Sequence, residues 1–388
     1  MMPKPLLIKN VKIFTPSNLI DNGWLIAENG KITNLGISHP PFPCSSQDYH
    51  IIEGNGLWLV PGFIDVHVHG ALGFEAMDGT PEALEAMSVF YAKHGVTGFL
   101  PTTWAADLPQ LTRVLSVIKL MTQHEIPGAS ILGCHLEGPF INPSKAGAQN
   151  PEAISTPVAE SILPLLDLGI IKLITIAPEL PENDWLIREC VRRGITVSAG
   201  HTNATFEQMQ NAVAIGVRHI THTFNAMQGL HHRDPGTAGA ALSLDELTCE
   251  LIADGIHVHP AMLKIAYRAK TNSQIVLVTD AMRGTGLPDG DYPIDDRIVS
   301  IRNGAARLPG GQLAGSTLTL DVALKNMIAA TGAPLEALLP TVTSNPASSL
   351  KISRQKGSIA IGKDADLVLI DSDIKVHMTI ISGKIISG

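Results

Sequence analysis

Short apolar runs alternate with amphipathic segments through the centre of the chain. The amphipathic segments, such as PEALEAMSVFYAKHG and TFEQMQNAVAIGVR, carry apolar residues at helical spacing. The apolar runs are short and rich in β-branched residues, as buried parallel strands are. There are eight: residues 63–70, 95–104, 130–138, 170–179, 196–202, 219–226, 249–257 and 274–282. Eight strand-and-helix units close a parallel barrel, so the pattern predicts an α/β fold with a (β/α)8 TIM-type barrel.

The two ends of the chain have a different pattern. LLIKNVKIF and WLIAENGKITNLG near the start are strand-like, and Asn29-Gly30 suits a tight hairpin turn. From Gly357 onward, short β-rich segments again alternate with glycine turns and no helical period is present. We therefore predict a small β-sandwich domain built from residues 1–60 and 346–388, flanking a barrel domain of residues 61–345.

Composition narrows the class of protein. Of the 388 residues, 45% are hydrophobic and 16% are charged, which provides for a large core. A net charge of -8 argues against a nucleic-acid partner, and no apolar stretch is long enough for a membrane span or a signal peptide. The four cysteines, Cys44, Cys134, Cys190 and Cys249, lack paired spacing, so neither disulfides nor a thiolate metal site is indicated. We expect a soluble cytoplasmic protein.

Metal-ligating side chains recur where the predicted strands end. His67 and His69 are two residues apart, so both imidazoles project from one face of the first strand. The ends of later strands supply Glu137, His201, His222, His257 and Asp280. Because the loops at the carboxyl ends of barrel strands build the active site, we expect these side chains to converge.

Imidazole and carboxylate ligands suit zinc and similar divalent ions, and four histidines with a glutamate can serve one or two of them. Each histidine taken singly fits a hydrogen-bonded core residue, but the set at matching positions favours a metal centre. A bound metal ion makes hydroxide available at neutral pH, and Asp280 could transfer its proton to a leaving group. The predicted reaction class is hydrolysis.

The motifs PGFIDVHVHG, HLEGPF, GHTNAT, THTFNAM, DGIHVHP, VTDAM and LAGSTLTL resemble the amidohydrolase superfamily. More narrowly, HLEGPF with THTFNAM and RDPG resembles the N-acetylglucosamine-6-phosphate deacetylase family. That resemblance implies metal-dependent cleavage of the acetamide of a phosphorylated amino sugar in amino-sugar recycling. It implies that Glu137, His201 and His222 hold the principal ion, and that Asp280 is the acid/base. His67 and His69 are retained, so a second ion has ligands, and Glu137 is the candidate bridge.

The resemblance also implies a set of substrate-binding residues. Arg233 is expected to bind the phosphate bidentately and, as in the family, to reach the partner subunit's site, which implies a homodimer. The remaining residues that match the family's sugar-phosphate site are Asn225, Ala226, His257, Leu313, Ala314 and Gly315.

Gln149 departs from the family pattern, which usually has a histidine at this place to polarise the acetamide oxygen. A glutamine amide can donate a hydrogen bond there but cannot carry a positive charge. Gln149 therefore leaves open a related amidohydrolase that acts on another N-acyl amino sugar or a cyclic amide. A catalytically silent scaffold is a third alternative, which the complete set of ligands together with Asp280 argues against.

Overall fold

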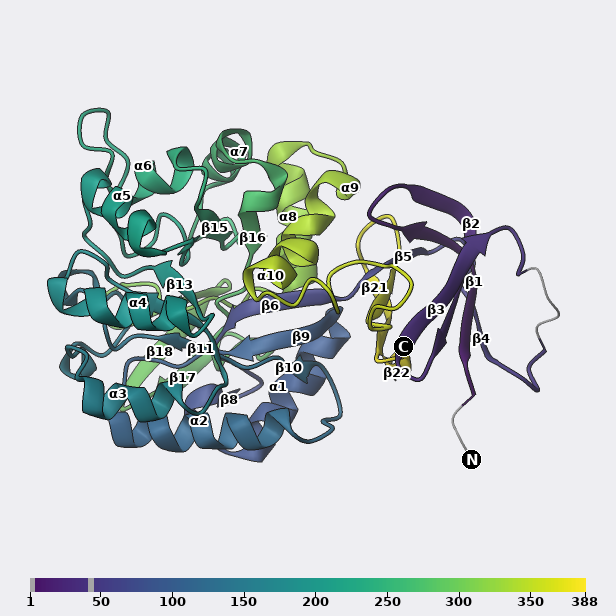
Figure 1. Ribbon diagram of the computed structural model, residues 1–388, viewed down its shortest axis with the longest axis horizontal. Helices are drawn as coiled ribbons and strands as arrows, with labels where there is room; N and C mark the ends of the chain where they lie inside the picture. The colour runs from purple at the N-terminus through teal and green to yellow at the C-terminus, as the bar shows by residue number, and fades with distance from the viewer. Residues whose placement is uncertain (1–3, 41–44) are drawn as a thin grey trace.

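The computed structural model describes residues 4–40 and 45–388. Its larger part has parallel strands at the centre and helices around them, and a separate sheet of mixed parallel and antiparallel strands lies beside it (Figure 1). The chain starts in that second sheet, runs through the larger part and returns to the second sheet.

The central strands form two parallel sheets, ordered β10-β9-β6 and β11 to β16. Isolated parallel bridges connect them, Thr102 to His135 on one side and Val68 to Ala281 on the other. Each of the eight predicted strand segments overlaps at least one of these strands. Their bounds are β6 Phe63–Val68, β9 Val96–Pro101, β10 Ser130–Ile131, β11 Cys134–Glu137, β12 Ile171–Ile176, β13 Thr196–Ala199, β14 His219–Ile220, β15 Thr248–Leu251 and β16 Ile275–Leu277.

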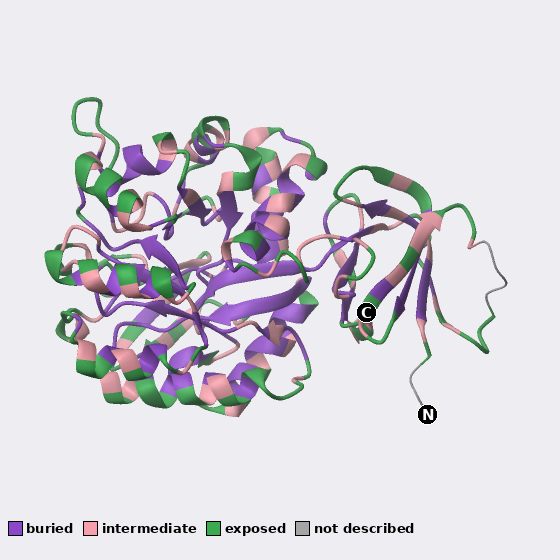
Figure 2. Ribbon diagram, in the orientation of Figure 1, coloured by how far each residue is buried: buried purple, intermediate pink, exposed green. Residues whose placement is uncertain are grey.

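The helices cover the outside of the parallel strands, and most of them bury mainly one face, as the alternating colours in Figure 2 show. Several begin at residues that accept a backbone N–H: Thr80 caps α1, Asp107 caps α2, and Thr205 with Gln208 forms a capping box on α5. Their bounds are α1 Pro81–Lys93, α2 Leu108–Thr122, α3 Ala159–Leu166, α4 Asp184–Arg192, α5 Phe206–Ile215, α6 Gly236–Ser243, α7 Pro260–Ala269, α8 Leu320–Thr331, α9 Leu335–Leu338 and α10 Ser344–Ser349.

Strands from both ends of the chain share the second sheet. Its order is β22-β21-β20-β5-β1-β2-β3, and β4 pairs with β1. The Asn29-Gly30 turn between β2 and β3 has both residues in the left-handed region, which confirms the predicted hairpin. The bounds are β1 Leu6–Phe14, β2 Leu19–Glu28, β3 Lys31–Ile37, β4 His50–Glu53, β5 Trp58–Pro61, β20 Leu367–Ile370, β21 Val376–Ile381 and β22 Lys384–Ser387.

Two short antiparallel sheets were not predicted. One pairs β7 (Gly70–Ala71) with β8 (Phe74–Glu75), directly after the first central strand. The other contains β17 (Gly290–Ile294), β18 (Arg297–Arg302) and β19 (Ala305–Arg307), which follow the last central strand. Both sheets therefore lie at the carboxyl ends of parallel strands, where an active site is expected.

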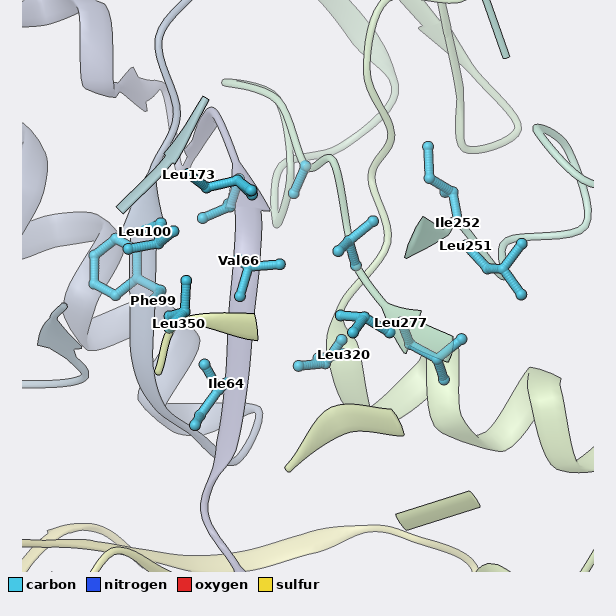
Figure 3. Packing of buried hydrophobic residues seen from close by; sticks show 14 of the residues in the cluster. Ile64, Val66, Phe99, Leu100, Leu173, Leu251, Ile252, Leu277, Leu320 and Leu350 are labelled. Carbon is cyan, nitrogen blue, oxygen red and sulfur yellow. The ribbon is translucent and has the colours of Figure 1, made fainter. Parts of the chain in front are cut away.

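The core lies between the parallel strands and the helices. All residues of β6 and β9 are buried, because both faces of these strands are covered. Figure 3 shows Ile64 and Val66 of β6 close to Phe99 and Leu100 of β9. Three cysteines, Cys134, Cys190 and Cys249, are buried free thiols, and Cys44 lies outside the described residues. Within residues 4–40 and 45–388, the longest apolar helical stretches fall short of what a bilayer crossing requires.

Candidate active site and metal centre

Six side chains from the ends of five central strands converge on one buried cluster. His67 lies in β6 and His69 directly after it, and Glu137 is the last residue of β11. Loops after β13, β14 and β16 supply His201, His222 and Asp280. Potential ligand atoms fall into two groups, His67 with His69 and Asp280, and Glu137 with His201 and His222, each within 4.8 Å.

Glu137 connects the two groups. Its Oε1 lies 3.1 Å from His222 Nε2 and 3.2 Å from His201 Nε2, and its Oε2 lies 3.2 Å from His69 Nε2. On the far side, Asp280 Oδ1 lies 3.2 Å from His69 Nε2. One carboxylate in this position can bridge two ions a few ångströms apart.

The hydrogen bonds behind the imidazoles show that this donor set fits a divalent ion. The Nδ1 of His69 faces the carbonyl oxygen of Thr102 and that of His201 faces the carbonyl oxygen of Lys145, at 3.2 and 2.9 Å. An Nδ1 that donates to a carbonyl carries the proton, so Nε2 of the neutral ring presents a lone pair to the cluster. Since His201 Nε2 and His222 Nε2 are only 3.0 Å apart, a cation is the natural partner for such lone pairs.

The electrostatics of the cluster also favour a cation. Burial raises the pKa of Glu137, but the charge of His67 and hydrogen bonds from His201 and His222 hold it well below its usual range. The pKa of Asp280 is likewise lowered, because His67 and His69 outweigh the effect of burial. In turn Glu137 and Asp280 raise the pKa of His67 against the effect of its burial. Two ionised carboxylates that are almost completely shielded from solvent must therefore be compensated by positive charge, which protons on the imidazoles or a metal ion can supply.

The backbone at the strand ends is strained in a way that turns these side chains inward. His201, His222 and Asp280 have φ values of 47°, 29° and 49°, in the left-handed region that residues other than glycine rarely occupy. Gly315, with φ 67°, lies so close to the Asp280 loop that an added Cβ would be 3.0 Å from the Asp280 carbonyl oxygen. Strained backbone of this kind is concentrated at functional sites.

A cavity of about 350 Å³ opens above the cluster. Nine of the residues singled out in the sequence line it: Glu137, His201, His222, Asn225, Ala226, His257, Asp280, Leu313 and Gly315. His257 is oriented by Asp254, whose Oδ2 lies 2.6 Å from its Nδ1. The cavity is large enough for a small sugar derivative and has the metal cluster at its floor.

Five of the singled-out residues do not line the cavity. His67 and His69 lie beneath its floor, and Ala314 is buried behind its neighbours Leu313 and Gly315. Arg233 is exposed on the loop before α6, with Nη1 2.8 Å from His232 Nε2. Gln149 is buried, donates to Glu137 Oε2 at 2.8 Å and accepts from the Ala105 N–H at 2.6 Å. Both ends of the Gln149 amide are therefore already engaged within the protein.

Several residues of the site were missed in the sequence. The Trp104 ring stacks on His69 with ring centroids 3.7 Å apart and also lines the cavity. Arg307 and Gln312, from β19 and the loop after it, contribute a cation and an amide to the cavity wall. Glu250 of β15 lies behind His67. No motif contains them. Trp104 and Glu250 lie in predicted strand segments, and this was the only signal for those two.

Replacing Gln149 with leucine is expected to lower the free energy of unfolding by about 1–3 kcal/mol, because the Ala105 N–H loses its partner in a buried place. Urea unfolding of the metal-free protein measures this loss. Gln355→Leu, at an exposed position, is the matched control and should stay within about 0.5 kcal/mol of the wild type. Equal stability of the Gln149→Leu variant and the wild type would show that the Gln149 amide does not stabilise the contact with Ala105 and Glu137.

Comparison with known proteins places this arrangement in a family. The profile of the amidohydrolase family matches residues 58–386. The N-acetylglucosamine-6-phosphate deacetylase of Bacillus subtilis is 38% identical over 99% of this chain and 98% of its own length. The N-acetylgalactosamine-6-phosphate deacetylase of Escherichia coli O157:H7 is 35% identical over 95% of this chain and 97% of its own.

Solved structures agree with the sequence relatives. The N-acetylglucosamine-6-phosphate deacetylase of Thermotoga maritima has a TM-score of 0.88 at 35% identity, covering 98% of this chain and 99% of its own. An aspartate-to-alanine mutant of the Mycobacterium smegmatis enzyme, in complex with N-acetyl-D-glucosamine-6-phosphate, has a TM-score of 0.92 at 29% identity and covers both chains completely. The resemblance found in the motifs is thus confirmed, and the chain belongs to the amidohydrolase family and, within it, to the family of the N-acetylglucosamine-6-phosphate deacetylases.

Proposed function

We propose that this protein hydrolyses the acetamide of N-acetylglucosamine 6-phosphate to glucosamine 6-phosphate and acetate, in the recycling of amino sugars. The observation that carries the proposal is the cluster of four imidazoles and two carboxylates at the floor of a sugar-sized cavity. Full-length relatives with this activity in their names support the choice of substrate.

The family is metal-dependent, and the cluster has two sets of ligands. We assign the principal ion to Glu137, His201 and His222, and a second ion to His67, His69 and Asp280, with Glu137 between them. Zinc suits nitrogen and oxygen ligands of this kind. When bound, the ion lowers the pKa of water and polarises a carbonyl oxygen.

Asp280 is assigned the proton transfers. Its carboxylate is ionised at neutral pH, because His67 and His69 outweigh the effect of burial on its pKa, and it lines the cavity. As water adds to the acetamide carbon, a C–O bond forms and Asp280 accepts the proton of that water. Asp280 then donates this proton to the amide nitrogen, the C–N bond breaks, and acetic acid and the amine leave, which become acetate and the ammonium form as the remaining proton is transferred.

The walls of the cavity hold the sugar phosphate in this proposal. Asn225 and Ala226 from the loop after β14, His257 from the loop after β15, and Leu313 and Gly315 from the segment after β19 line the cavity, and Ala314 is buried between the last two. Arg233 serves a partner subunit's cavity in a homodimer, since it lies away from the cavity of its own chain. Gln149 acts by holding Glu137, because its amide is already bonded there.

The architecture that supports the site is inferred to be a complete (β/α)8 barrel. The two isolated bridges, Thr102 to His135 and Val68 to Ala281, join the two parallel sheets on both sides, which supports a closed ring of strands. We assign residues 61–345 to this barrel, and residues 1–60 with 346–388 to a small β-sandwich domain. Pairing of β5 with β20 supports that division.

We infer that the enzyme acts in the cytoplasm. A phosphorylated sugar is charged and does not cross a membrane unaided, so its hydrolase works in the compartment where the phosphate was added. Buried free thiols at Cys134, Cys190 and Cys249 agree with a reducing compartment.

The function is tested by acetate release from N-acetylglucosamine 6-phosphate, its galacto epimer and the unphosphorylated sugar. We expect turnover of the 6-phosphate of the gluco sugar to exceed that of the other two, and removal of metal by a chelator to abolish it until zinc is restored. Preference for the galacto epimer would instead align the protein with its Escherichia coli relative. Undiminished turnover after exhaustive chelation would refute the metal mechanism.

Asp280→Asn should lower kcat by roughly 10²–10⁴-fold while the 6-phosphate still binds, because asparagine cannot transfer the proton. Single-turnover acetate release measures the rate and calorimetry measures binding, with metal content determined in parallel. The control is Asp296→Asn, at an exposed position in the turn between β17 and β18 and outside the lining of the cavity. Full activity of Asp280→Asn would remove Asp280 from the mechanism.

Arg233→Ala should raise KM for the 6-phosphate by about 10–100-fold, the loss expected for a hydrogen-bonded charge, and leave the unphosphorylated sugar unaffected. Steady-state kinetics on both substrates measure this, and Arg302→Ala, which removes an exposed pair with Asp291, is the control. If Arg307→Ala raises KM and Arg233→Ala does not, the phosphate is bound by the cavity's own chain.

A further inference from the structure

Glu250 lies one layer below the metal cluster and is completely buried in β15. It does not line the cavity, so it cannot touch a substrate there. No motif in the sequence marks it, and the proposed hydrolysis does not use it. A buried carboxylate is costly unless it is fully paired, so its contacts indicate what it does.

Those contacts reach both groups of metal ligands. Glu250 Oε2 lies 3.0 Å from His67 Nδ1 and accepts the backbone N–H of His222 at 3.1 Å. Its other oxygen, Oε1, lies 3.3 Å from Nδ1 of the buried His219. The same side chain thus contacts a ligand of the first group through its ring and a ligand of the second group through its backbone.

The bond to His67 determines how that ring faces the cluster. With its Nδ1–H donated to a carboxylate, the neutral ring has its Nε2 lone pair directed toward Glu137 and Asp280, both 3.5 Å away. His69 and His201 have backbone carbonyls in the same place. A carboxylate makes the imidazole a stronger base than a carbonyl does, so His67 becomes the better ligand.

The hydrogen bond from the His222 N–H to Glu250 stabilises the strained backbone conformation of His222. His222 has φ 29°, and its N–H points into the protein interior, where Glu250 accepts it. Without this acceptor the N–H would be buried and unpaired, which is unfavourable and would allow the loop to relax. A relaxed loop would turn the His222 ring away from Glu137.

We propose that Glu250 is a positioning residue that sets the affinity of the His67–His69–Asp280 group for a divalent ion and couples it to the Glu137–His201–His222 group. This rests on the metal centre of the proposed function. Its negative charge, together with those of Glu137 and Asp280, also suits two divalent ions better than one.

The test is a metal titration that does not depend on turnover. Metal-free protein is titrated with Co²⁺, followed by its visible absorption, and with Zn²⁺ by calorimetry. The wild type should bind two ions per subunit. Glu250→Ala should lower the affinity for the more weakly bound ion by about 10–100-fold, which is the usual loss when the hydrogen-bond partner of a ligating histidine is removed. Glu250→Gln should lose less, since its amide oxygen still accepts both hydrogen bonds.

Ser198→Ala is the matched control. Ser198 is equally buried among the central strands, and its Oγ bonds to Thr221 Oγ1 at 2.6 Å and to none of the six ligands. It should titrate as the wild type does. Far-UV circular dichroism of the metal-free variants verifies their folding, and Glu250→Gln serves if the alanine variant does not fold.

Wild-type affinities in both folded Glu250 variants would overturn the proposal, as would an equal loss in Ser198→Ala or a wild type that binds only one ion. A different result would refute the proposed function. A wild type that binds two ions but releases no acetate from any of the sugars would refute the deacetylase and leave the role of Glu250 standing.

Discussion

Burial of carboxylates beside imidazoles is the constraint on which the site depends. Glu137 and Asp280 are almost entirely removed from solvent, and an ionised carboxylate in such a place is tolerated only beside positive charge. The imidazoles supply it as protonated rings or release their protons and share a metal ion. Every other feature of the site, from the outer hydrogen bonds to the strained loops, keeps these groups facing one another.

The parallel strands make this arrangement possible because their carboxyl ends lie at one edge. Regular strand backbone, however, would carry the later ligands past the cluster. The left-handed conformations of His201, His222 and Asp280 turn the chain at the required residues, and the surrounding buried hydrogen bonds stabilise that strain. The outer bonds of three of the four imidazoles, two to backbone carbonyls and one to Glu250, then set the direction of those rings.

Much of this could be predicted from the sequence because it depends on pattern. Apart from Asp65, His67 and His69, the run of residues 63–70 is apolar, and short runs of this kind are typical of strands covered on both faces. The positions of His67, His69, Glu137 and Asp280 at strand ends predicted their convergence, and the ligand groups of the structure contain these residues. The sheet β17–β19 was missed because its strands are short, half exposed and interrupted by turn residues, which leaves little period to detect.

What the sequence could not provide was the orientation of single side chains. The same amide of Gln149 could point into the cavity or, as the structure has it, toward Glu137 and the Ala105 N–H. Glu250 could not be recognised from a sequence motif, because its partners lie in β6 and in the loop after β14 and contact it only in the folded chain. Contacts between segments this far apart in sequence are set by packing, and local pattern does not encode them.

The pairing of β5 with β20 brings together residues 58–61 and 367–370. During translation, the first strands emerge from the ribosome several hundred residues before their neighbour does, so one edge of the early sheet stays open while the rest is synthesised. A nascent polypeptide thus exposes an unpaired strand edge, which is a template for aggregation, until residues 367–370 have been synthesised.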